Sequence, residues 1–143
     1  MKLLALQDLS MFTVEEIIEH LINEYSGTAS GHDYGQVTEE TKASAKELLK
    51  DIEPLIAYES VGDYGCDSSS FFLLKNVKTG VLYEVHGSHC SCFGFEGQLQ
   101  LEETSVDALK KRCEGDKNVF YTGGYDENGG ENYVAVKKYI QSL

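Results

Sequence analysis

The feature that most constrains the fold is a pair of apolar segments at the centre of the chain, residues 70–76 and 80–86, which Val77-Lys78-Thr79 separates. Both segments are rich in Phe, Leu, Val and Tyr, residue types that favour β-strands. Gly80 can adopt the positive φ that a tight turn requires. Because strands joined by so short a connection run antiparallel, the sequence predicts a central β-hairpin.

Helical patterns precede this hairpin. Thr13-Val14-Glu15-Glu16 forms a capping box, and apolar residues then recur at helical spacing as far as Tyr25. A second helix is expected to begin at about Thr38 and to end at Pro54. Its apolar face is expected to consist of Ala45, Leu48, Leu49 and Ile52.

The other expected elements are strands at 55–61, 98–101 and 119–121, a helix that Thr104 opens with Asp107 at the capping-box position, and a last helix from about Glu131. Helices and strands therefore do not alternate strictly along the chain. This order favours the α+β class, with a mostly antiparallel sheet, two N-terminal helices, one helix after the segment 83–98 and a C-terminal helix. A chain of 143 residues is expected to form one domain, 1–143.

Chemistry-bearing residues gather in the segment 83–98, called here the Cys/His segment, which holds two of the four Cys and two of the four His. One interpretation is a structural zinc site, because zinc prefers four thiolate or imidazole ligands in a tetrahedron. Cys90 and Cys92 lie on one side of an extended backbone and can point at one ion. The set would be completed by Cys66 and by His89, with His86 as the alternative ligand.

Two further interpretations of the Cys/His segment stay open. In the first, His86 or His89 activates a thiolate for catalysis. The candidates for that chemistry are Cys90, Cys92, His86, His89 and Glu96, the last as an orienting carboxylate. No nucleophile motif is met, which favours a protein that is not an enzyme. In the second, the thiols are small buried hydrophobes in a Gly-dependent turn packed under the hairpin.

The net charge of −12 is unevenly distributed, since residues 1–63 carry 13 acids and 4 bases and residues 64–143 carry 11 acids and 8 bases. A negative field repels phosphate backbones and anionic membranes, so we expect neither direct nucleic-acid binding nor membrane binding. A basic protein partner is favoured, although acidity also serves solubility. The glutamates expected to contact that partner are Glu15, Glu16, Glu19, Glu39 and Glu40.

No apolar run approaches the roughly 20 residues that span a bilayer. Asp8 interrupts the apolar beginning of the chain, and no cleavage site of small residues follows a long apolar core, so no signal peptide is expected. These features predict a cytoplasmic protein. In a cytosolic chain the four cysteines are expected to be thiols or metal ligands rather than disulfides.

The stretch Tyr-Glu-Val-His-Gly-Ser-His-Cys-Ser-Cys-Phe-Gly-Phe-Glu-Gly-Gln at 83–98 resembles the core of small phage and bacterial proteins that carry a YEVHGSHCSCYGFEGQ-type segment. No activity is established for that family, so the resemblance implies a phage or mobile-element setting and no catalytic role. Small acidic phage proteins often bind and inhibit host proteins, and the setting would then be the host cytoplasm.

The sequence therefore favours a non-enzymatic, acidic binding protein of phage or prophage type, an inhibitor or modulator of a host or defence protein. The alternatives are a structural zinc-binding protein and a small Cys/His-dependent hydrolase or transferase. Each alternative depends on the Cys/His segment folding together into one site.

Overall fold

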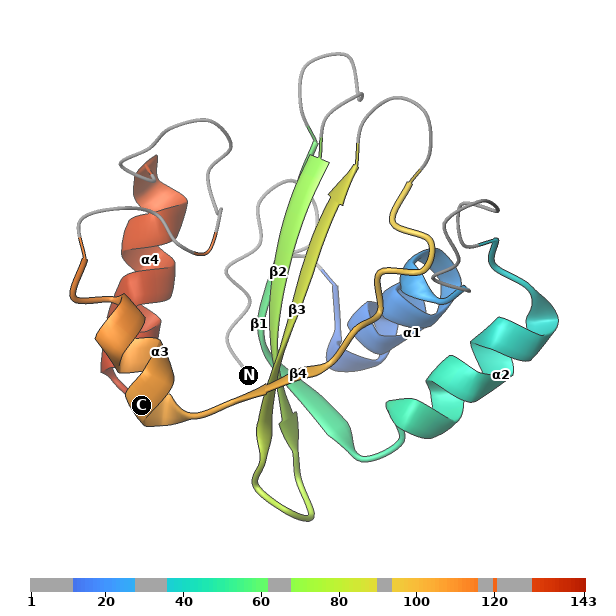
Figure 1. Ribbon diagram of the computed structural model, residues 1–143, viewed down its shortest axis with the longest axis horizontal. Coiled ribbons are helices and arrows are strands. Elements are labelled where there is room, and N and C mark those ends of the chain that lie inside the picture. The colour runs from blue at the N-terminus through green and yellow to red at the C-terminus, as the bar shows by residue number, and fades with distance from the viewer. Residues whose placement is uncertain (1–11, 28–35, 62–67, 90–93, 116–119, 121–129) are drawn as a thin grey trace.

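The computed structural model describes residues 12–27, 36–61, 68–89, 94–115, 120 and 130–143. In this part of the chain an antiparallel sheet has two helices on each face (Figure 1). The strands are β1 (Ile52–Val61), β2 (Ser68–Asn76), β3 (Leu82–His89) and β4 (Glu102–Thr104). The helices are α1 (Val14–Tyr25), α2 (Glu39–Leu48), α3 (Val106–Arg112) and α4 (Gly130–Gln141). This arrangement confirms the predicted α+β class and its antiparallel sheet.

The predicted hairpin is formed by β2 and β3, which pair in the register Leu74 to Tyr83. Its turn closes with a hydrogen bond of 2.8 Å from the Gly80 amide to the Asn76 carbonyl, and Gly80 has a φ of 77°. The Asn76 side chain accepts two further backbone N–H groups of the turn. Strand order in the sheet follows chain order, β1-β2-β3-β4, so every neighbouring pair is antiparallel.

The capping box of α1 is present as predicted, with Thr13 as the N-cap and Glu16 closing it. The expected end of the second helix at Pro54 is wrong. α2 ends at Leu48, and Pro54 lies in β1 beside a register shift. The reason is tertiary: Ile52 pairs with Asn76, which takes the chain into the sheet, and an edge strand with a bulge tolerates the missing N–H of proline.

The strand expected at 98–101 is also wrong, because the chain joins the sheet only at β4. Gln98 instead pairs with β3 through its side chain, whose amide accepts from the Ser88 N–H and donates to the Ser88 carbonyl, each at 2.7 Å. α3 is capped by Ser105 rather than opened by Thr104. The strand expected at 119–121 lies mostly outside the described residues. The structure describes only Phe120 of this stretch, and its side chain is fully buried.

Each face of the sheet supports its own core. Phe71 and Leu73 of β2 pack with residues of α3 and α4, whereas Phe72 and Leu74 pack with residues of α1. Successive side chains of a strand point to opposite faces, so the centre of β2, residues 71–74, is a continuous apolar run because both of its faces are covered. Within the described residues, no helix has the length and apolar character needed to cross a membrane.

Candidate functional site

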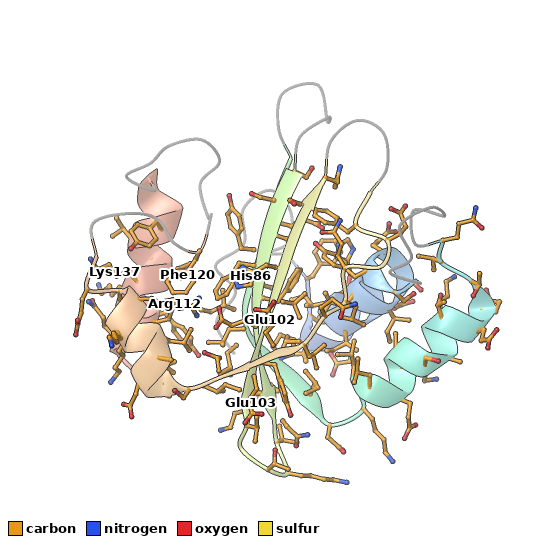
Figure 2. The ribbon with its side chains drawn as sticks, in the orientation of Figure 1. His86, Glu102, Glu103, Arg112, Phe120 and Lys137 are labelled. Carbon is orange, nitrogen blue, oxygen red and sulfur yellow. The ribbon has the colours of Figure 1, made fainter. Side chains whose placement is uncertain are left out.

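The alternation of side chains along β3 separates the two histidines of the Cys/His segment. His86 lies on the face covered by α3 and α4 (Figure 2), with its ring 5.1 Å from that of Phe71. His89 lies on the other face, edge-on to Phe95 at 4.5 Å. Residues three apart on a strand point in opposite directions. A ligand on one face therefore meets only one of these imidazoles.

His86 belongs to a cluster with Glu84 and Arg112, called here the carboxylate–histidine cluster. Glu84 Oε1 lies 3.0 Å from His86 Nε2, and its other oxygen accepts from the guanidinium of Arg112. Glu84 is 5% exposed. Arg112 comes from the last turn of α3 and also lies over the Phe120 ring, 4.8 Å from its centroid. One buried carboxylate thus joins the sheet to the α3–α4 layer.

The environment of Glu84 keeps it ionised. Burial by itself raises the pKa of this carboxyl, but hydrogen bonds from His86, Arg112 and Thr104, with the charge of Arg112, outweigh burial and lower the pKa to about 2. An ionised carboxylate only accepts hydrogen bonds, so Nε2 of His86 carries the proton. A carboxylate behind one ring nitrogen is also the arrangement found in histidines that bind metals through the other.

A cavity of about 340 Å³ adjoins His86. It is lined by Ser69, Ser70, His86, Gly87 and Ser88. Because Ser69 pairs with Ser88 across the strands, both side chains share the sheet face of His86. An oriented imidazole beside two hydroxyls can hold a small polar ligand, accept a proton or contribute to a metal site.

The predicted thiol ligands Cys66, Cys90 and Cys92 lie outside the described residues, so both the zinc set and the thiol chemistry stay predictions. In the part of the chain that the structure describes, no group of three His, Cys, Asp or Glu side chains could hold a metal ion. The strand ends nearest these cysteines are adjacent, since Ser68 pairs with His89. Both cysteine-bearing segments are therefore attached at one end of the sheet.

Glu96 was the expected orienting carboxylate, but Glu84 holds that position for His86. Oε2 of Glu96 is buried and has no hydrogen-bond partner within the described residues. The sequence signal for Glu84 was available, because residues two apart on a strand share a face. No spacing in the sequence indicates that Arg112 contacts Glu84, because the two residues lie 28 positions apart. Cys113 is fully buried in the α3–α4 core, where burial raises the pKa of its thiol.

A second polar cluster lies on the opposite face and was not predicted. Glu59 of β1 accepts a 2.7 Å hydrogen bond from the Tyr25 hydroxyl, and His20 Nε2 lies 3.0 and 3.1 Å from its two oxygens. Burial and the Glu59 charge raise the pKa of Tyr25 well above its usual value. Burial lowers the pKa of His20, but Glu59 outweighs that effect and raises it. These contacts fix the end of α1 on the sheet.

The two helical layers differ in charge. α1 and α2 carry seven Glu against two Lys, a net charge of −5, whereas α3 and α4 carry five bases against two acids, +3. The expected partner-binding glutamates are all exposed: Glu15, Glu16, Glu19, Glu39 and Glu40. Glu16 closes the capping box of α1, and Glu39 pairs with Lys42 at 3.6 Å. All five glutamates thus lie on the two helices that carry the net negative charge.

Fold and site together define an α+β domain in which an antiparallel sheet separates an acidic helical layer from a basic one. Comparison of the chain with protein-family models, curated proteins and solved structures finds no match.

Proposed function

We propose that this chain is a non-enzymatic binding protein that recognises a basic protein partner through the outer face of α1 and α2. The observation that carries the proposal is the charge of −5 on these helices, set against +3 on the opposite layer. The resemblance of the Cys/His segment favours a phage or prophage setting. The partner is then a host or defence protein whose activity the binding inhibits or modulates.

The charge separation has a direct consequence for association. Complementary fields accelerate the encounter of two proteins and orient them, and this effect weakens as salt rises. α1 carries four Glu and no Lys or Arg, so its charges are not neutralised within the helix. Its capping box and its buried stripe fix that face toward solvent. The acidic layer therefore approaches a basic surface first.

Charge reversal on α1 tests this proposal. We expect Glu15→Lys with Glu19→Lys to weaken partner capture from host lysate about tenfold, and to reduce its salt dependence, because attraction becomes repulsion. The measurement is an affinity pull-down at low and at moderate salt. Glu102→Lys with Glu103→Lys is the matched control, since both residues are exposed on β4 and the change in charge is the same. Equal capture by both variants would contradict the proposal.

A structural zinc site is a second candidate, favoured by the Glu84–His86 contact of 3.0 Å, which orients an imidazole as metal ligands commonly are. If Cys90 is a ligand, protein purified without added metal should hold stoichiometric zinc, and Cys90→Ser should lose it. Elemental analysis measures both. His20→Asn, on the other sheet face, should keep the metal. Substoichiometric zinc that Cys90→Ser leaves unchanged would remove this candidate.

A further inference from the structure

The acidic layer contains a hollow of about 710 Å³ at the junction of α1 and α2, which lie side by side on one face of the sheet (Figure 1). Its walls include Ser26, Thr41, Ser44, Ala45, Leu48 and Leu99. Three different parts of the chain thus contribute: the end of α1, one side of α2 and the segment that precedes β4. We call this hollow the α1–α2 groove.

Hydrogen bonds hold the walls of the groove in place. The hydroxyl of Ser26, just after α1, lies 3.4 Å from that of Thr41 in the first turn of α2. The Leu99 amide donates to the Tyr25 carbonyl at 3.1 Å, and the Gly97 amide donates to the Ser26 carbonyl at 3.2 Å. Walls fixed before binding reduce the entropy that a ligand must lose to be held.

Leu48 gives the groove an apolar contact surface. The sequence predicted it on the buried face of the second helix with Ala45 and Leu49, which are 4% and 2% exposed. The structure instead leaves Leu48 52% exposed on the wall of the groove. A single exposed leucine is ordinary on a protein surface. Here it adjoins Ala45 and Leu99 in a concave site, the setting in which binding anchors occur.

The rim of the groove is negative. Glu40 lines it, and Glu47 lies seven residues further along α2, which at about 3.6 residues per turn places it on the same side of the helix. The same spacing places Lys42 and Lys46 on the other side of α2 from Ser44, a wall residue. Both glutamates are exposed. The apolar patch thus lies beside two carboxylates, and the lysines of α2 are on the opposite side of the helix from the groove.

We propose that the α1–α2 groove binds a short segment of the partner protein in which one apolar side chain is flanked by Lys or Arg. This inference rests on the proposed function and names the chemistry that its acidic layer recognises. The apolar side chain packs against Leu48, and the flanking cations pair with Glu40 and Glu47. Affinity comes mainly from the buried anchor, while the charges set orientation and the rate of encounter.

Charge favours a segment of a partner protein over two other possible occupants of the groove, which are residues 28–35 of the chain itself and a second copy of the chain. The chain's own connection between α1 and α2, residues 28–35, contains no Lys or Arg and so lacks the cations that the rim would attract. A second copy of the chain would bring a net charge of −12 toward another of −12, and the +3 on its α3 and α4 helices offsets only a small part of that charge. Repulsion of that size opposes self-association through an acidic groove. A basic segment of a different protein is the occupant that the charges favour.

Fluorescence anisotropy with a labelled model peptide tests the inference. The peptide carries one Leu flanked on both sides by Lys and Arg, and two comparison peptides replace the Leu by Ser or the cations by Glu. We expect the first peptide to bind at low salt, and each comparison peptide to bind at least about tenfold more weakly, since anchors and complementary charges both contribute. Failure of the first peptide to bind would overturn the inference.

Variants of the protein locate the binding. Leu48→Ser should lower the affinity for the peptide about tenfold, because one buried anchor is lost. Val134→Ser changes a residue of α4 that is 60% exposed and should leave the affinity unchanged. Glu40→Lys with Glu47→Lys should remove most of the salt dependence. All these residues are exposed, so the fold is expected to persist, and circular dichroism checks it. Equal binding by Leu48→Ser and by Val134→Ser would overturn the inference.

The other occupants give different results. If the chain itself fills the groove, the peptide binds only after residues 28–35 are replaced by a Gly/Ser linker. If a second copy fills it, sedimentation shows self-association that Leu48→Ser abolishes. Either result overturns the inference. Glu15→Lys with Glu19→Lys could weaken partner capture while Leu48→Ser leaves it unchanged. That result would overturn the inference about the groove and would keep the proposed function.

Discussion

Arg112→Ala is expected to lower the free energy of unfolding by about 3 kcal/mol at neutral pH, because it removes the cationic partner of a buried carboxylate. Glu84 is 5% exposed and accepts from Arg112. Without the guanidinium, only His86 and Thr104 remain to compensate for burial of the carboxylate. The Phe120 ring loses the cation above it as well. Urea denaturation measures the change.

The matched control is Lys111→Ala, which removes an exposed base from the same turn of α3 and should change stability by less than about 0.5 kcal/mol. A second comparison separates the ion pair from simple loss of packing. Adding Glu84→Gln to Arg112→Ala should recover part of the loss, because no unpaired charge is then buried. If Arg112→Ala costs no more than Lys111→Ala, the carboxylate–histidine cluster does not hold the α3–α4 layer as we infer.

The same ion pair sets a pH dependence whose sign follows from the pKa of Glu84. The pKa falls from an ordinary 4.5 to about 2 on folding, so the unfolded chain binds the proton more readily. The stabilisation is therefore complete above pH 4.5 and is lost as pH falls toward 2. A shift of this size corresponds to about 3 kcal/mol. Arg112→Ala should flatten this part of the stability profile.

Local patterns in the sequence were sufficient for the elements whose causes are local. The capping box at Thr13, the helical spacing that follows it and the turn at Gly80 each depend on residues close in the chain, and each is present in the structure. The α+β class followed because the expected helices and strands do not alternate strictly and the hairpin requires antiparallel strands. These features could be predicted since every contact they need lies within a few residues.

The incorrect boundaries have tertiary causes. Helical spacing continues through Ile52, but pairing of Ile52 with Asn76 of β2 takes those residues into the sheet. Gln98 has a strand-like sequence context, yet its side chain rather than its backbone pairs with Ser88. In both cases the choice depends on a partner strand that lies ten or more residues away.

The candidate site divides in the same way. The Cys/His segment was predicted to form one cluster because the strand was expected to end at His86. β3 instead continues to His89, and residues three apart on a strand point to opposite faces. Glu84 could have been found from its two-residue spacing to His86. The contacts of Arg112 with Glu84 and of His20 with Glu59 span 28 and 39 residues, and no local pattern indicates them.

Gly87→Ala is expected to destabilise the protein by about 2–3 kcal/mol, the cost of inserting a methyl group into a packed core. A Cβ at this position of β3 would lie 2.4 Å from Ser70 Oγ and 2.8 Å from Phe95 Cδ1. The Ser70 hydroxyl can rotate away. The Phe95 ring has less freedom, because it stacks on Tyr25 at 4.6 Å and meets His89 at 4.5 Å. Thermal or urea unfolding measures the loss.

Gly115→Ala is the matched control, since the nearest atom to its Cβ would be 3.9 Å away. It should be neutral or stabilise the protein by up to about 1 kcal/mol, because alanine lowers the conformational entropy of the unfolded chain. A double-mutant cycle then assigns the cause. In a Phe95→Leu background the side chain is smaller and less constrained, so Gly87→Ala should cost clearly less than in the wild type. An equal cost in both backgrounds would contradict the steric account, and the requirement for glycine would then lie in the backbone of β3 itself.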